Sequence, residues 1–176
     1  RVEEVDPRRG LRSKPEPVAN SVLAALPRTL YQRLLPDMTP VTLDFGRVLY
    51  EPGEPIRDVY FPHRCVVSLL TLIEGRLALE VGLVGREGMV GMPLALGVAV
   101  SPVRALVQGA GSALRMGAAR FRHVLRENAP LQGALYRYTH ALMSQITQTA
   151  ACNRFHSVEA RLARWLLMTR DRAQSA

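Results

Sequence analysis

The chain has 176 residues, of which 48% are hydrophobic and 22% charged, and a formal net charge of +8. This length and composition indicate one globular domain with an appendage and exclude a wholly disordered chain. No run of about 18 apolar residues occurs, so the sequence predicts no membrane-spanning helix. Two widely separated cysteines, Cys65 and Cys152, offer no disulfide framework, so we expect a cytoplasmic protein.

The basic residues gather at the two ends of the chain. Only Lys14 is a lysine among the 23 basic residues, and many of the arginines lie in the N-terminal arm or near the C-terminus. Such ends are typical of nucleic-acid contacts, and equally of solvated surface. Residues 1–19 mix charges with three prolines and show no apolar period, which predicts a disordered basic arm.

The next part of the chain changes from helical to strand-like patterning. Asn20 and Ser21 can cap a short helix that Pro27 should interrupt. From Val41 onward, short alternating segments are separated by glycine and proline turns. The predicted strands are residues 41–43, 47–50, 58–61, 66–73, 76–84, 103–107 and 113–116, with a tight hairpin turn at Glu74-Gly75. This spacing predicts an all-β roll, sandwich or barrel.

A glycine-rich loop interrupts these strands at residues 84–97. Gly85, Gly88, Gly91 and Gly97 fall within it. Backbone N–H groups in such a loop can cradle an anion, and a long turn is the alternative. The spacing is neither a Walker loop, since no Gly-Lys-Ser/Thr follows, nor a dinucleotide fingerprint, since no clear helix is predicted after it.

Three helices are predicted after the last strand, at residues 118–127, 130–153 and 157–170. The second has mostly apolar residues at alternating spacings of four and three. The residues at this spacing include Leu131, Leu135, Tyr138, Leu142, Gln145 and Thr149. Because a helix of this length extends roughly 36 Å, we expect it to contact the roll on one side and a partner helix on the other. The alternative is a helix packed wholly on its own domain. The last helix, capped by Ser157, has an apolar face with nothing obvious to cover it.

The order of these parts resembles that of bacterial Crp/Fnr-type transcription regulators over roughly residues 20–170. The resemblance rests on Leu23-Ala24-Ala25-Leu26-Pro27, Val48-Leu49-Tyr50, Pro52-Gly53, Val59-Tyr60-Phe61-Pro62, the glycine punctuation and the tail from Ala151 to Met168. It implies a mainly β fold with helices: a cyclic-nucleotide-binding-like double-stranded β-roll of the jelly-roll type over residues 20–129. A long dimerisation helix over 130–153 should follow. Residues 154–176 would begin a winged helix-turn-helix domain, which the printed sequence does not contain.

The resemblance also implies an effector pocket beneath the glycine-rich loop. Its candidate residues are Gly85, Arg86, Glu87, Gly88, Gly91, Met92, Arg104, Ala105, Ile146 and Thr147. Cyclic-nucleotide-binding members carry a glutamate after the last loop glycine and an Arg-Ser pair before the next strand. Here Met92 and the pair Val103-Arg104 stand at those places, and Arg104 or Arg86 would have to replace the missing phosphate ligand. We therefore expect no cyclic AMP, no other cofactor, and an effector smaller or more apolar than a nucleotide.

These patterns favour a non-enzymatic regulator that forms a homodimer and binds DNA only as part of a longer protein. The alternative is a stand-alone cyclic-nucleotide-binding-like regulatory subunit without DNA binding. A cupin-type enzyme would need a His-x-His metal motif, which does not occur. Cys152 and His156 are four residues apart on one helix, but no third ligand lies near them, so no metal site is predicted.

Overall fold

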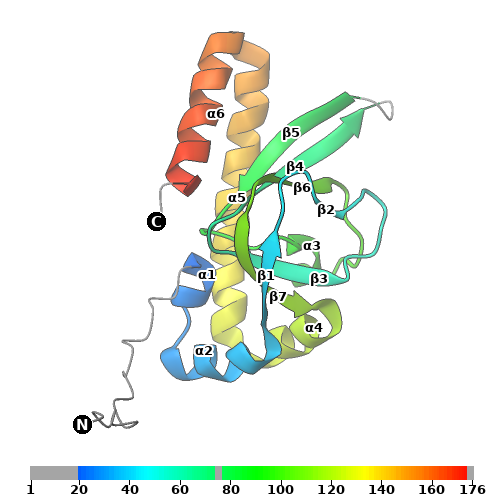
Figure 1. The fold of residues 1–176 in the computed structure, drawn as a ribbon, viewed down its shortest axis with the longest axis vertical. Helices are drawn as coiled ribbons and strands as arrows, with labels where there is room; N and C mark the ends of the chain where they lie inside the picture. Colours follow the sequence, from blue (N-terminus) through cyan, green and yellow to red (C-terminus); the bar gives the residue numbers. More distant parts are fainter. Residues whose placement is uncertain (1–19, 74–76, 174–176) are drawn as a thin grey trace, which may run out of the picture.

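The computed structural model describes residues 20–73 and 77–173. A β-roll forms its centre, short helices close one end, and two long helices lie along one side (Figure 1). The predicted arm, residues 1–19, and the predicted turn at Glu74-Gly75 lie outside the described residues. The helices are α1 (Ser21–Ala24), α2 (Arg28–Leu34), the 3₁₀ helix η1 (Leu35–Asp37), α3 (Met92–Ala95), α4 (Ala118–Glu127), α5 (Ala129–Phe155) and α6 (Val158–Ala173).

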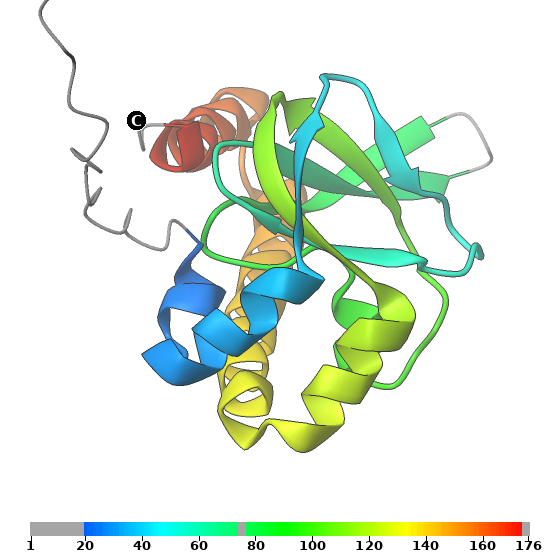
Figure 2. The ribbon, with the colours of Figure 1, turned by 60° about the horizontal axis from the view of Figure 1, so that its bottom comes forward.

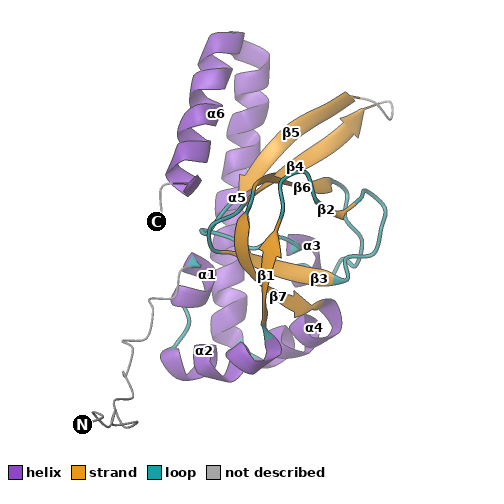
Figure 3. Cartoon of the chain, viewed as in Figure 1, coloured by secondary structure: helices purple, strands orange, loops and turns teal. Residues whose placement is uncertain are grey.

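The roll consists of two antiparallel sheets (Figure 3). The strands are β1 (Thr39–Leu43), β2 (Val48–Tyr50), β3 (Asp58–Pro62), β4 (Val66–Ile73), β5 (Leu77–Val84), β6 (Arg104–Gly109) and β7 (Gly111–Gly117). One sheet has the order β1-β7-β3 and the other β2-β6-β4-β5. All predicted strands are present and differ only at their ends. The predicted mainly β roll with helices is confirmed.

The core lies between the two sheets and beneath the helices. Strand residues whose side chains alternate inward, such as Leu43 and Phe61, are fully buried there. Phe121 of α4 and Leu135 of α5 reach the same cluster from outside the sheets. The helices therefore complete a core that the strands alone would leave open, as expected for sheets with one apolar face.

Asn20 ties the first helix to two distant segments. Its side-chain oxygen accepts hydrogen bonds from the backbone N–H groups of Val22 and Leu23, which makes it the predicted N-cap of α1. Its amide donates to the carbonyls of Pro62 and Gly88, at 3.0 and 2.8 Å. Because Asn20 is completely buried, these bonds satisfy a polar group that would otherwise destabilise the core. The helical segment breaks before Arg28, as the proline at position 27 predicts.

A short helix, α3, lies within the second half of the glycine-rich loop, where the sequence predicted none. Gly91 has φ of +103° and precedes the single turn of α3. Its position against β3 leaves little space, since an added Cβ would lie 2.9 Å from Val59 Cγ1. Four residues are too few to produce a recognisable helical period, and this is why the pattern missed the helix.

Helices α5 and α6 form an antiparallel pair beside the roll (Figures 1 and 2). The chain leaves α5 through His156 in an extended conformation, and Ser157 Oγ then accepts a hydrogen bond from Ala160 N at the start of α6. Arg164 of α6 donates to Thr149 of α5 at 3.0 Å. Part of the face predicted to lack a cover, including Leu162 and Leu166, is exposed. No described helix is long and apolar enough to span a bilayer.

Candidate functional site

A cavity of about 240 Å³ opens between the roll and the middle of α5. Strands β4 and β5 form one wall with Leu69 and Val81, and α5 forms the opposite wall. The glycine-rich loop covers one end, where Val90 and Tyr60 exchange backbone hydrogen bonds of 3.0 and 2.8 Å. These bonds fix the loop to β3, so the cavity has a pre-formed rim. The lining residues are Tyr50, Leu69, Val81, Met89, Val90, Gly91, Met92, Pro93, Leu96, Pro102, Val103, Thr139, Leu142, Met143 and Ile146.

This β-roll cavity is lined almost wholly by apolar groups. Of the described residues that line it, none is charged, and the polar side chains are Tyr50 and Thr139. Burial raises the pKa of Tyr50 to about 12, so its phenol stays neutral at physiological pH. The Thr139 hydroxyl donates to the carbonyl of Leu135 within α5. The cavity therefore offers shape and apolar contact, with little capacity to hold a charged ligand.

Comparisons with known proteins agree with this geometry at the level of the fold. No protein-family model and no curated protein matches the sequence. Among solved structures, the c-di-GMP-responsive global regulator CLP of Xanthomonas campestris superposes with a TM-score of 0.66, at 19% identity over 80% of this chain and 70% of that one. The fold is that of a Crp/Fnr-type, cyclic-nucleotide-binding-like β-roll domain.

Two further Crp/Fnr-type structures show the same architecture. The sensor domain of the transcriptional regulator DNR from Pseudomonas aeruginosa has a TM-score of 0.52 and 20% identity, covering 68% of this chain and 86% of that chain. A CooA mutant from Carboxydothermus hydrogenoformans has a TM-score of 0.61 and 13% identity, covering 88% and 99%. Identities this low establish a shared fold, and function has to be argued from the site.

Three of the candidate effector residues line the β-roll cavity of this Crp/Fnr-type fold: Gly91, Met92 and Ile146. The other candidates, Gly85, Arg86, Glu87, Gly88, Arg104, Ala105 and Thr147, do not line it. The sequence analysis also missed lining residues on β4 and β5, such as Leu69 and Val81. Strand alternation could have placed them on the inner face, but no local signal says which inner residues border a void.

The two arginines considered as replacement phosphate ligands are directed elsewhere. Arg104 Nε lies 2.8 Å from Glu51 Oε2 in a partly exposed ion pair, and this pairing raises the pKa of the guanidinium. The side chain of Arg86 is exposed, and its carbonyl accepts a hydrogen bond from Ser21 N. Neither arginine, as described, faces the β-roll cavity, where a phosphate ligand would have to lie.

Gly88 and Glu87 contact helices rather than the cavity. An added Cβ at Gly88 would overlap the ring of Tyr138, so glycine is needed for the close approach of the loop to α5. Glu87 Oε1 accepts hydrogen bonds from Gly85 N at 3.1 Å and from Arg172 Nε at 2.8 Å. The glycine-rich loop is thus fastened to α5 on one side and to the end of α6 on the other.

The predicted dimerisation face of α5 is corrected by the structure. Leu131, Leu135, Tyr138 and Leu142 all belong to the buried core of their own domain. Gln145 is also turned inward, since its amide donates to Leu83 O and its carbonyl accepts from Leu83 N, and Thr149 pairs with Arg164 of α6. The apolar period identified the face that packs on the chain itself, because burial in a core and burial against a partner require the same residue types.

Proposed function

We propose that the chain is the sensory and dimerisation part of a Crp/Fnr-type DNA-binding transcription regulator. The observation that carries this proposal is the β-roll cavity, whose second wall is the long helix α5. A ligand in this cavity would contact the roll and α5 together, and so favour one arrangement of the two over another. In the longer protein, α5 and α6 would transmit that preference to a DNA-binding domain.

The proposed effector is a small apolar molecule. A buried phosphate requires a positioned cation and hydrogen-bond donors, and the described lining contains no basic side chain. Loss of a buried charge-assisted pair typically costs about 2–5 kcal/mol, or roughly 30- to 5000-fold in affinity. Cyclic AMP would therefore bind too weakly to occupy the site.

The proposed homodimer uses the outward face of α5. Tyr136 and Met143 are exposed large side chains on this face, and His140 and Thr147 continue it at the same four- and three-residue spacing. Met143 and Thr139 also line the β-roll cavity. A second copy packed along this face would thus cover part of the cavity wall, so effector occupancy and dimer geometry would be coupled.

The effector class can be tested by thermal unfolding with toluene and with cyclic AMP. A preformed apolar cavity binds aromatic hydrocarbons, and a ligand that binds only the folded state raises the unfolding temperature. Toluene should raise the unfolding temperature of the unmodified chain. It should do the same for the control variant Val48→Phe, which changes an exposed residue of β2. In Val81→Phe, where the larger side chain fills the cavity, toluene should not raise the unfolding temperature.

Calorimetry supplies the complementary measurement. Cyclic AMP at up to about 1 mM should give no binding heat, because no described cation faces the cavity. Low-micromolar binding of cyclic AMP would refute the assignment of an apolar effector. Absence of any toluene effect in the unmodified chain would refute the cavity as a ligand site.

A further inference from the structure

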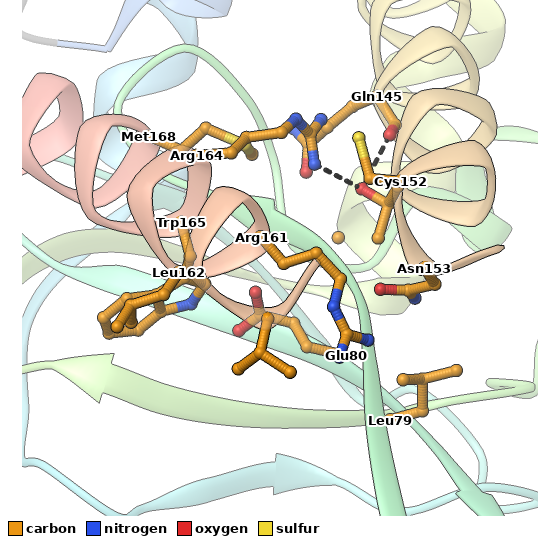
Figure 4. Close-up of a pocket in the computed structure, with 13 residues that line it drawn as sticks. Leu79, Glu80, Gln145, Cys152, Asn153, Arg161, Leu162, Arg164, Trp165 and Met168 are labelled. Carbon is orange, nitrogen blue, oxygen red and sulfur yellow. Dashed lines mark hydrogen bonds between the residues drawn. The ribbon is translucent and has the colours of Figure 1, made fainter. Parts of the chain in front are cut away.

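A second cavity, of about 300 Å³, lies between α5, α6 and β5. Figure 4 shows Arg161, Trp165 and Met168, which extend from α6, and the side chain of Glu80 of β5 beside Arg161. The lining of this α5–α6 cavity has no residue in common with the β-roll cavity. The two are therefore separate spaces that involve different sides of the same helix.

Most polar groups on the α5 wall are already used. Gln145 makes two hydrogen bonds to the backbone of Leu83, at 2.6 and 3.1 Å. The Thr149 hydroxyl donates to the carbonyl of Gln145 and accepts from Arg164 Nη1 at 3.0 Å. These side chains hold α5 against β5 and α6. Because their polar groups already have hydrogen-bond partners, they shape the cavity but are not free to bind a ligand.

Arg161 differs from these residues. Its Nε–H is buried and has no hydrogen-bond partner in the described part of the chain, and none of the ion pairs formed there includes it. Buried polar groups are paired in the great majority of cases, and each exception calls for a partner that is missing. The Arg161 side chain as a whole is only partly buried and lines the cavity, so a ligand acceptor in the cavity could bind the accessible N–H groups of its guanidinium.

The charge around the cavity favours a ligand that carries one negative charge. Arg161 and Arg164 contribute two positive charges, and Glu80 contributes one negative charge. One Glu80 oxygen accepts a hydrogen bond from Ser68 Oγ at 2.6 Å, which fixes the carboxylate in place. The fixed carboxylate repels any anion, but it repels a dianion such as phosphate more strongly than a monoanion, and a single carboxylate can bind the arginine fork in bidentate fashion.

The other residues that line the cavity favour a ligand whose uncharged part is apolar. Trp165, Leu162 and Leu79 border the cavity beside Arg161, and an indole ring next to aliphatic side chains favours a planar apolar group. We propose that the α5–α6 cavity is a second ligand site, which binds a small aromatic monocarboxylate through Arg161 and Trp165. Such a ligand would bridge β5 and α6 and hold α6 in the observed position. This site is distinct from the apolar effector site.

The single tryptophan of the chain gives a direct test, because Trp165 lines this cavity. The probe is 3-phenylpropionate, with the uncharged 3-phenylpropanamide and inorganic phosphate as comparisons. The unmodified chain should show a saturable change in tryptophan fluorescence with 3-phenylpropionate, and at least about tenfold weaker responses to the amide and to phosphate. The amide lacks the negative charge that pairs with Arg161, and phosphate in its dianionic form is repelled more strongly by Glu80 than a monocarboxylate is.

Single substitutions test whether the fluorescence response comes from binding in the α5–α6 cavity. Arg161→Met, which keeps an unbranched apolar side chain, should weaken the response at least about tenfold. Arg170→Met on the exposed part of the same helix and Val81→Phe in the β-roll cavity should leave it unchanged. Equal responses to the acid and the amide, a response unaltered in Arg161→Met, or no saturable response up to about 10 mM would each overturn the proposal. The acid–amide comparison needs only the unmodified chain, so it decides the matter even if Arg161→Met fails to fold.

Discussion

The two faces of α5 share one helix but differ in what surrounds them. On the inward face, Leu131 and Leu135 are 1% and 0% exposed, whereas Tyr136 and Met143 on the outward face are 57% and 63% exposed. The inward face contributes to the stability of the domain itself. The outward face contributes little to it and is the face that we propose binds a second copy. The difference teaches that the regular apolar period of this long helix marks the face that packs into the core of its own domain.

The largest expected effect comes from truncating the inward face. Leu135→Ala should lower the free energy of unfolding by about 2–5 kcal/mol, because it leaves a cavity in a completely buried cluster. Leu166→Ala, on the exposed face of α6, should change it by less than about 0.5 kcal/mol. Urea unfolding followed by circular dichroism measures both. Similar losses for the two variants would contradict the distinction between buried and exposed faces.

The pH dependence of stability above about pH 9 is a second way to compare the inward and outward faces of α5. Burial, and then the charge of Glu87, raises the pKa of Tyr138 on the inward face. Tyr138 therefore holds its proton more tightly in the folded state than in the unfolded state. The contribution of this tyrosine to the free energy of unfolding is fully present below about pH 10. It is lost as pH rises further, by up to about 1.4 kcal/mol per pH unit.

The matched variants are Tyr138→Phe and Tyr136→Phe, two residues apart on opposite faces. Chemical unfolding between pH 9 and about pH 11 should show a shallower decline of stability for Tyr138→Phe than for the unmodified chain. Tyr136→Phe, on the exposed face, should retain the original decline. Identical pH profiles for all three proteins would show that the Tyr138 hydroxyl is not buried as described.

A smaller effect is expected where α6 meets the glycine-rich loop. Arg172 is 14% exposed and Glu87 is 37% exposed, with 2.8 Å between Arg172 Nε and Glu87 Oε1. Arg172→Ala should lower overall stability by no more than about 1 kcal/mol, but should speed amide hydrogen exchange in the last turns of α6. Arg170→Ala removes an exposed pair with the adjacent Asp171 and is the control. Equal exchange in both variants would mean that the pair does not hold α6 in place.

Much of the fold follows from local patterns. Alternating strands, the Asn20 cap and the break at Pro27 depend on neighbours in sequence, and each was predicted where the structure has it, within a few residues. The hairpin turn predicted at Glu74-Gly75 lies outside the described residues. The short helix α3 was missed because a single turn has no period. The local signals were therefore sufficient for the roll and the long helices.

The site was predicted less completely because it depends on contacts between distant segments. The pairing of Arg104 with Glu51 joins residues 53 positions apart, and nothing near either residue indicates it. The return of α6 along α5 is set by the extended backbone at His156, which an amphipathic pattern does not specify. The resemblance located the loop and the long helix, but tertiary packing decided which side chains border each cavity.

Sedimentation velocity of the unmodified chain at micromolar concentration tests the two-face account of α5 most directly. The account predicts a dimer, and it predicts that Tyr136→Asp combined with Met143→Asp converts it to a monomer with little change in the free energy of unfolding, since both side chains are largely exposed. Leu167→Asp, which alters an exposed residue of α6, should remain dimeric. An unmodified chain that sediments as a monomer, or a double variant that remains a dimer, would contradict the assignment of the outward face to a second copy.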